Sequence, residues 1–419
     1  MKYCPECGEN VENITDKCPN CGFDIANHLK ELEAREKERM EKDRFLFTEK
    51  YYDFAHPDFH CNSQFQPDMV AATPMIRLNP VFKEMVWGGN RLKTEFGYDI
   101  PGDDTGECWA ISAHPHGDCT VNGGRYDGKK LSWLWENEPQ LFGRQQLPSE
   151  CFPLLIKIID AKKDLSIQVH PDDEYAHIHE NGSKGKTECW YILDCDPGAT
   201  IIVGHNAKTH EELEEMIANN RWNELLREIP IKKGDFFQIF PGTVHAIKGG
   251  TLILETQQNS DVTYRVYDYG RLQNGKPRDL HIRQSLDVIR VPFDASAGFE
   301  KGTPLEGSAN ESLVECGKYK VWHLKCSEGS VYRGPGAGYM LCSVISGEGS
   351  IFPVSGTGNA LPVDTGAGLN TDLDITRMMA DETFTRLKKG DHFILTSGFT
   401  SFVTKGSFEM ICSMPNICI

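Results

Sequence analysis

The sequence predicts a mainly β protein, and two observations carry that prediction. From about residue 73 onward, short apolar runs such as MIRLNPVF and CWAISAHP are separated by turns rich in Gly, Pro and Asn, a pattern typical of strands. The pattern Lys-Lys-Gly-Asp-x-Phe, first seen at Lys232–Phe237, recurs within Leu387–Ser397. Because this internal echo repeats a strand and its turn, it indicates a second, related β domain.

Length and charge indicate the number of domains and exclude some classes of function. A chain of 419 residues is long enough for two or three domains. Its 61 acidic against 44 basic residues give a net charge of −17, which argues against general binding to nucleic acid or to an anionic membrane. Apolar runs stay well short of the roughly 18 residues that span a bilayer, and the first residues do not resemble a signal peptide. We therefore expect a cytoplasmic protein.

The amino terminus, residues 1–24, contains two Cys-Pro-x-Cys-Gly knuckles, which place cysteines at Cys4, Cys7, Cys18 and Cys21. Each knuckle presents two sulfurs to one ion, so the set predicts a zinc ribbon with a closed four-thiolate site. Such sites are structural rather than catalytic. A redox dithiol pair is the alternative, and the doubled knuckle disfavours it. The ribbon could dock a protein partner.

Three further segments follow the ribbon. Residues 25–72 begin with strong helix formers and end in an irregular stretch, which predicts a helical and irregular linker. Residues 73–300 are expected to form the first β domain, with helical insertions at 131–149 and 208–228. Residues 301–419 are expected to form the second β domain. Its copy of the repeated segment ends without a histidine, so we expect this domain to bind no metal.

Polar residues in the first β domain predict a metal centre. Gln168 and His170 are two apart in an alternating apolar segment, so both should project from one face of a strand. Glu188 opens the strand-like run ECWYIL, and His245 follows a strand and a Pro-Gly turn. Two imidazoles, a carboxylate and an amide oxygen suit zinc or a similar divalent metal. The alternative for each histidine is an ordinary hydrogen-bonded core residue.

Three more polar residues share these segments. Ser166 lies on the predicted strand face of Gln168 and His170, and Lys186 lies two residues before Glu188, on what should be the same strand face. Lys157 stands alone in the apolar run PLLIKII, where a charge needs a partner, and a substrate phosphate would suit it. A solvated surface charge is the alternative for any lysine.

Six segments resemble, in order, the signature segments of the type I mannose-6-phosphate isomerases, which have the cupin fold. The resemblance covers roughly residues 75–290. The segments are VWGG (86–89), GECWAISAH (106–114), LSIQVHPD (165–172), KTECW (186–190), FPGTVHAIKG (240–249) and TQQNSDVTYRVYDYGR (256–271).

The resemblance implies a fold and a set of site residues. The fold would be two cupin-type jelly-roll β-barrels with small helical insertions, the second of them free of metal. The residues implied are the metal ligands Gln168, His170, Glu188 and His245; the catalytic residues Arg265 and Lys186; Ser166 and Lys157 near the phosphate; and Trp87 and Glu107 near the sugar. Zinc is the implied catalytic metal, and another divalent ion would also fit.

The implied reaction interconverts mannose 6-phosphate and fructose 6-phosphate through an enediol. The base that moves the proton stays open between Lys186, a metal-bound hydroxide and a nearby His or Asp. Two other functions stay open as well. One is isomerisation of another phosphorylated aldose, such as glucose 6-phosphate. The other is a non-catalytic cupin that binds and senses a sugar phosphate, with the ribbon docking a partner.

Overall fold

The structure is a computed structural model that describes residues 73–144, 151–273, 275–294, 303–304, 310–355 and 385–416, together with the isolated residues 17, 19, 21, 24 and 30. The chain divides into two units, residues 1–70 and 71–419, and each is described here by itself. Among the described residues, no helix is both long enough and apolar enough to cross a membrane.

In the amino-terminal unit, Lys17 and Asp24 form an antiparallel β-bridge, and Cys21 between them is exposed. The bridge brings together the two ends of the segment that contains the second Cys-Pro-x-Cys knuckle. Cys4, Cys7 and Cys18 of the predicted ribbon lie outside the described residues, and so does the predicted linker apart from Lys30.

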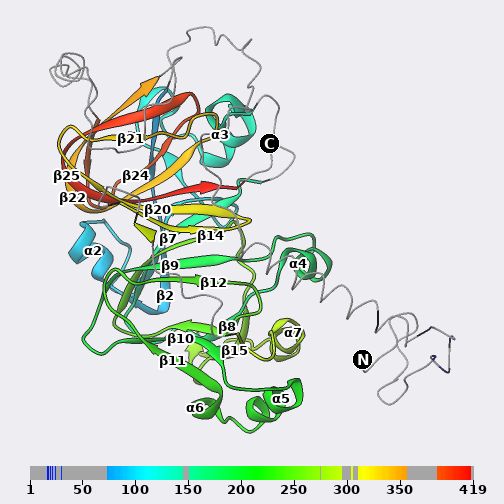
Figure 1. Cartoon of the computed structure of the whole chain (residues 1–419). Coiled ribbons are helices and arrows are strands. Elements are labelled where there is room, and N and C mark those ends of the chain that lie inside the picture. The colour runs from blue at the N-terminus through cyan, green and yellow to red at the C-terminus, as the bar shows by residue number, and fades with distance from the viewer. Residues whose placement is uncertain are drawn as a thin grey trace. The chain divides into compact units, whose positions relative to one another are not determined.

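The second unit is mainly β, as predicted, and its centre is a six-stranded sheet (Figure 1). In spatial order this sheet contains β12 (Phe236–Ile239), β9 (Glu188–Cys195), β14 (Thr251–Gln258), β7 (Leu154–Ala161), β2 (Val81–Gly89) and β3 (Thr105–Ile111). Every residue of β7 and of β14 is buried. Full burial explains why β7, LLIKIIDA, reads as a nearly continuous apolar run, since both of its faces are covered. Strand β14, TLILETQQ, is equally buried but polar over its second half.

A five-stranded sheet covers one face of the central sheet. It contains β11 (Leu226–Pro230), β10 (Thr200–His205), β13 (His245–Ile247), β8 (Ile167–Val169) and β15 (Tyr264–Tyr267). The two sheets share a core in which Ile159 and Ile253 of the central sheet cluster with Val203 and Ile247 of the five-stranded sheet. The candidate site residues project between these two sheets.

A ten-stranded sheet covers the opposite face. Its main path runs through β18 (Thr303–Pro304), β19 (Glu311–Glu315), β20 (Tyr319–Cys326), β25 (Phe399–Pro415), β22 (Met340–Ser355), β24 (His392–Leu395), β1 (Met75–Asn79) and β6 (Thr120–Val121), with β21 (Val331–Arg333) paired to β25 and β23 (Thr385–Lys388) paired to β22. Ile156 and Ile158 of the central sheet cluster with Ile394 and Ile411 of this sheet. The central sheet is therefore a middle layer.

β1 and β6 precede the predicted domain boundary at residue 300, yet both belong to the sheet formed by the strands that follow it. β1 pairs with β24 from Met75↔Leu395 to Leu78↔His392. Ile76 and Leu78 alternate inward and are 2% and 5% exposed. Burial of these two side chains explains why the chain contributes β1 to the ten-stranded sheet before it enters the central sheet with β2. The domain boundaries themselves stay predictions.

The helices are short and peripheral. They are α2 (Arg91–Phe96), α3 (Leu131–Asn137), α4 (Asp173–His179), α5 (His210–Ala218), α6 (Trp222–Leu225) and α7 (Ile282–Val288). The expected single helix over 208–228 was wrong, because α5 ends at Ala218 and Asn220 adopts a left-handed conformation with φ 54° before α6 begins. Helix α4 was also missed. Its start is capped by the Asp172 carboxylate, which accepts a hydrogen bond from Tyr175 N.

The core of the ten-stranded sheet gives a stability prediction. Phe402 is fully buried and stacks on Tyr332 with ring centroids 5.2 Å apart. Phe402→Ala should lower the free energy of unfolding by about 3–5 kcal/mol, because it leaves a cavity in a packed core. Denaturant unfolding measures this loss, and exposed Lys405 provides the control. A Phe402→Ala protein as stable as Lys405→Ala would contradict the assigned packing.

Candidate active site

Three potential metal ligands meet between the central and five-stranded sheets. His170 follows β8, Glu188 begins β9 and His245 begins β13. The Nε2 atoms of His170 and His245 lie 3.1 Å apart, and each is 3.4 Å from a different oxygen of Glu188. All three side chains are at most 1% exposed. Gln168 of β8 pairs directly with His245 of β13, and its Nε2 lies 3.3 Å from His245 Nε2.

Hydrogen bonds on the far side of each imidazole orient the two histidines. His170 Nδ1 donates to the carbonyl of Val262 at 2.9 Å, and His245 Nδ1 donates to the carbonyl of Thr243 at 2.8 Å. With the proton on Nδ1, the lone pair of each Nε2 points toward Glu188. Burial lowers the pKa of His170 to about 3 and also lowers the pKa of His245, so both rings are neutral at neutral pH.

Glu188 is the charged member of the group. It is 0% exposed; its Oε2 forms an ion pair with the Lys186 ammonium, whereas its Oε1 has no hydrogen-bond partner among the described residues. Burial opposes its ionisation, but the nearby Lys186 ammonium holds the pKa of Glu188 well below its ordinary value. A buried carboxylate with unused lone pairs, faced by two neutral imidazoles, fits a divalent cation.

Lys186 supplies a positive charge beside these ligands. Its Nζ is 2.6 Å from Glu188 Oε2 and 3.2 Å from His170 Nε2, and the residue is 5% exposed. The predicted position of Lys186 on the strand of Glu188 was wrong, because β9 begins only at Glu188. Lys186 instead lies in the preceding loop, where its backbone N–H donates to the carbonyl of Pro171.

A second buried charged group stands on the central sheet beside the candidate ligands. Lys157 Nζ lies 3.7 Å from Glu107 Oε2 and 3.6 Å from Glu255 Oε1. Burial alone would lower the pKa of Lys157, but the two carboxylates raise it above its ordinary value. A substrate phosphate was the predicted partner of Lys157. The protein itself supplies two carboxylate partners, so the charge of Lys157 is already compensated.

Each carboxylate of this group also accepts an indole hydrogen bond. Trp109 Nε1 donates to Glu107 Oε2 at 2.6 Å, and Trp190 Nε1 donates to Glu255 Oε2 at 3.1 Å. Glu255 was missed by the sequence analysis, although a lone acid in the apolar run TLILE was a visible signal. Burial and then the charge of Glu188 raise the pKa of Glu255 above its ordinary value.

The other predicted residues have different surroundings. Ser166 is buried, and its hydroxyl lies 3.4 Å from Gln168 Oε1, so it borders the candidate ligands. Trp87 is 2% exposed and belongs to the core cluster of the two sheets, together with Trp190. Trp87 is therefore packed between the two sheets, and its place near the sugar stays a prediction.

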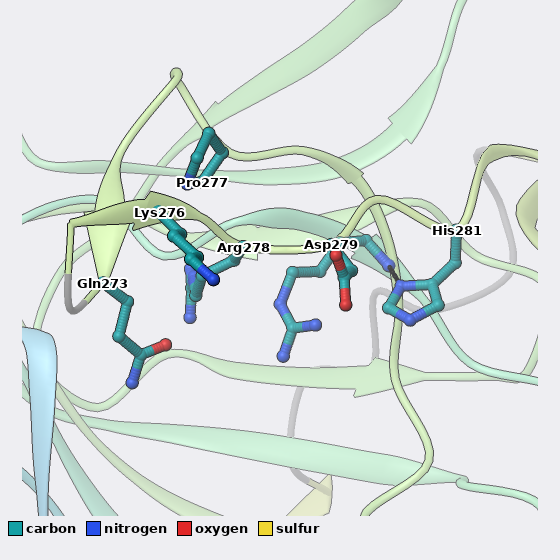
Figure 2. Close-up of a pocket in the computed structure, with 7 residues that line it drawn as sticks. Gln273, Lys276, Pro277, Arg278, Asp279 and His281 are labelled. Carbon is teal, nitrogen blue, oxygen red and sulfur yellow. Dashed lines mark hydrogen bonds between the residues drawn. The ribbon is translucent and has the colours of Figure 1, made fainter.

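Arg265 is one of seven residues that line a cavity of about 330 Å³, and Figure 2 labels the other six. On β15, Arg265 pairs with Gln168, which pairs in turn with His245, so the three residues form one row across the sheet. The cavity is lined by Arg265, Gln273, Lys276, Pro277, Arg278, Asp279 and His281. Burial and the nearby Arg278 lower the pKa of Arg265 from its ordinary value. Its Nε atom is buried and without a hydrogen-bond partner among the residues described.

The cations of this cavity come largely from a hairpin that the sequence analysis did not single out. Lys276 belongs to β17 (Lys276–Pro277), which pairs with β16 (Leu272–Gln273). The segment GKPRDLH carries a lysine, an arginine and a histidine within seven residues, and this density was a usable signal. Asp268, which directly follows β15, pairs with Arg271 and Arg278.

His114, His116 and Asp261 form another group of potential ligands. His116 Nδ1 is 2.6 Å from Asp261 Oδ2, and the His116 side chain is 71% exposed. His114 Nδ1 already accepts the backbone N–H of His116 at 3.2 Å, and Lys83 donates to the His116 carbonyl. These hydrogen bonds occupy part of the ligand set, so we describe the group as a hydrogen-bonded surface cluster.

The fold and the site together define a cupin-like β protein with a buried His-Glu-His centre suited to a divalent metal. Residues 75–189 match the catalytic domain of type I phosphomannose isomerase. The chain is 46% identical over 344 residues to the mannose-6-phosphate isomerase ManA of Bacillus subtilis, covering 81% of this chain and 99% of that protein. It is 45% identical to the mannose-6-phosphate isomerase of Streptococcus mutans, over 83% of this chain and 100% of the relative.

A solved structure agrees with these relatives. The crystal structure of mannose 6-phosphate isomerase from Bacillus subtilis matches with a TM-score of 0.71 and 42% identity, covering 81% of this chain and 99% of that one. The chain therefore belongs to the type I phosphomannose isomerase family.

Gly185 gives a test of how the loop before β9 positions Lys186. A Cβ on Gly185 would lie 2.3 Å from the backbone carbon of Asp172 and 2.5 Å from Asp173 N, so the loop would have to move. Gly185→Ala should therefore displace Lys186 and lower stability by about 1–3 kcal/mol. Thermal unfolding and steady-state turnover measure the two effects. Gly317→Ala is the control, because a Cβ there meets no atom within 4 Å; equal behaviour of the two variants would exclude the close approach.

Proposed function

We propose that this chain is a metal-dependent aldose–ketose isomerase that interconverts mannose 6-phosphate and fructose 6-phosphate. The observation that carries the proposal is the buried carboxylate of Glu188, whose oxygens face the Nε2 atoms of His170 and His245 and whose Oε1 has no hydrogen-bond partner among the described residues. Two neutral buried imidazoles whose Nε2 atoms face one buried carboxylate form a ligand set suited to a divalent cation. Membership of the type I phosphomannose isomerase family supports the same conclusion.

The proposed metal ligands are Gln168, His170, Glu188 and His245. A bound zinc or similar ion would act as a Lewis acid that polarises the sugar carbonyl and stabilises the negative charge that develops on its oxygen. Neutral imidazoles with their Nδ1 protons fixed on backbone carbonyls present the nitrogen that such an ion needs. This hydrogen bonding also keeps each ring in one orientation.

Isomerisation removes a proton from C2 of the aldose and delivers one to C1, while a proton moves from the C2 hydroxyl to the C1 oxygen. Lys186, whose Nζ contacts Glu188 Oε2, is suited to donate a proton or to stabilise an oxyanion. Glu255 is a second proton carrier to consider, since its buried Oε1 has no hydrogen-bond partner in the described residues and its pKa is raised by burial. Lys186 and Glu255 are therefore the groups to test for the proton transfer.

The phosphate is proposed to bind in the cavity lined by Arg265, Lys276, Arg278 and His281. Three of these side chains carry a fixed or nearly fixed positive charge, against the single carboxylate of Asp279 that lines the same cavity. Lys157 is already paired with two carboxylates. We therefore assign Lys157, Glu107 and Ser166 to the sugar side of the site rather than to the phosphate.

The amino-terminal residues 1–24 are proposed to hold a second, structural zinc through Cys4, Cys7, Cys18 and Cys21. The bridge between Lys17 and Asp24 supports a turn at the second knuckle. A four-thiolate site needs reduced cysteines, so we propose that the protein works in the cytoplasm. A partner protein docked on the ribbon stays part of this proposal.

Metal counting tests the assignment of the two sites. The purified protein should isomerise mannose 6-phosphate, lose this activity with a strong chelator and regain it with zinc, because the carbonyl needs a Lewis acid. The intact chain should hold one metal more than a chain that begins at residue 73. In the intact chain, His245→Ala should lose the proposed catalytic metal and keep the zinc of residues 1–24.

Two results would contradict these assignments. Metal-dependent binding of mannose 6-phosphate without turnover would favour the sensor function, and faster turnover of glucose 6-phosphate would favour a different aldose. Retention of both metals by His245→Ala would remove His245 from the ligand set. Lys248→Ala, which changes a surface lysine paired with Glu228, is the matched control.

Arg265 gives a further prediction. Arg265→Ala should keep the metal, since Arg265 is not in the proposed ligand set, and should lower kcat/KM by about 100-fold or more if the guanidinium stabilises an oxyanion. Steady-state kinetics with metal analysis of the same sample measures this. Arg221→Ala, on an exposed ion pair with Glu215 and Glu224, is the control. Unchanged kcat/KM in Arg265→Ala would remove the assignment.

A further inference from the structure

Asp268 lies behind the cationic cavity and is itself not one of its lining residues. Its carboxylate is 4% exposed. Arg278 donates to both of its oxygens, from Nε to Oδ2 at 2.7 Å and from Nη2 to Oδ1 at 2.6 Å. Arg271 donates through Nε to Oδ1 at 3.1 Å. The bidentate contact fixes the plane of the Arg278 guanidinium as well as its position.

These contacts join two parts of the chain that meet at the cavity. Asp268 directly follows β15, the strand that carries Arg265, whereas Arg278 follows β17 of the hairpin. Arg271 adds a contact to the carbonyl of Asp164. Asp268 therefore connects the end of β15 to the segment that brings Arg278 to the cavity.

The electrostatics of the cavity explain why such a connection is needed. Arg265 and Arg278 both line the cavity, and their like charges repel, which contributes to the lowered pKa of Arg265. Without a counter-charge, two partly buried guanidiniums would separate, and each would order only when an anion arrived. The Asp268 carboxylate offsets the repulsion between Arg265 and Arg278 without lining the cavity itself. The side of Arg278 that faces the cavity is thereby left available to a ligand.

We infer that Asp268 is a positioning residue that holds Arg278 in place for the phosphate group of the substrate. This inference rests on the proposed function and deepens it. Asp268 does not contact the phosphate. Holding Arg278 in advance removes the cost of ordering a long side chain at each binding event, so Asp268 should affect substrate affinity more than the chemical step.

In Asp268→Asn, the loss of the negative charge and the loss of the contact to Arg278 should change phosphate binding in opposite directions. Removing a negative charge near an anion site would by itself tighten phosphate binding. Losing the bidentate contact would release Arg278 and weaken binding. We expect the loss of the bidentate contact to have the larger effect. KM for mannose 6-phosphate should therefore rise about 10-fold or more while kcat changes by less than about threefold.

The experiment uses the intact chain loaded with metal. Asp268→Asn is compared with Asp268→Glu, which keeps the charge and should recover part of the affinity. The matched control is Asp391→Asn, which breaks the Asp391–Arg77 pair in the ten-stranded sheet. Asp268→Asn is also combined with Arg278→Ala. If Asp268 acts through Arg278, adding Asp268→Asn to Arg278→Ala should change KM by less than about twofold.

Two outcomes would overturn the inference. An unchanged or lower KM in Asp268→Asn would show that the charge outweighs the position. A parallel loss of kcat, metal content and thermal stability would show a purely structural role. If the unaltered protein does not isomerise mannose 6-phosphate, the proposed function fails, and calorimetric binding of mannose 6-phosphate still decides the inference. Weaker binding by Asp268→Asn than by the unaltered protein supports it, and equal binding overturns it.

Discussion

The candidate site is arranged around one buried negative charge, the carboxylate of Glu188. Its oxygens lie between the Nε2 atoms of two histidines from the facing sheet, and the Lys186 ammonium approaches from the preceding loop. A charge at this depth is stable only if cations or oriented dipoles surround it. The backbone carbonyls that hold each Nδ1 proton, the loop that delivers Lys186 and the close contact of the two sheets all satisfy that one requirement.

Much of this site could be predicted from the sequence because its signals are local. Gln168 lies on β8 and His170 directly follows it, Glu188 begins β9, and His245 begins β13 after a Pro-Gly turn, so the local pattern of each segment predicts these side chains. The resemblance to a known family then named the same residues. The mainly β fold was visible for the same reason, since each strand carries its own pattern.

The remaining features depend on contacts between distant segments, which periodicity does not record. The two carboxylate partners of Lys157 lie on β3 and β14, the neighbours of β7, so a sequence that shows only an isolated lysine cannot name them. The link from Asp268 to Arg278 depends on how a hairpin folds back. The crossing of β1 into the ten-stranded sheet depends on β24, more than 300 residues later in the chain. In each case the pairing is set by tertiary packing rather than by local preference.

The pairing of β1 with β24 has a consequence for how the chain is made. β1 is synthesised before either sheet that contains the site, and its partner is among the last strands to leave the ribosome. Until β24 emerges, β1 keeps an unpaired edge with Ile76 and Leu78 uncovered, the kind of edge that recruits other chains. Premature termination before β24 would therefore leave a chain that contains every proposed metal ligand of the β unit. In that chain β1 would keep an exposed, unpaired edge that can pair with other chains.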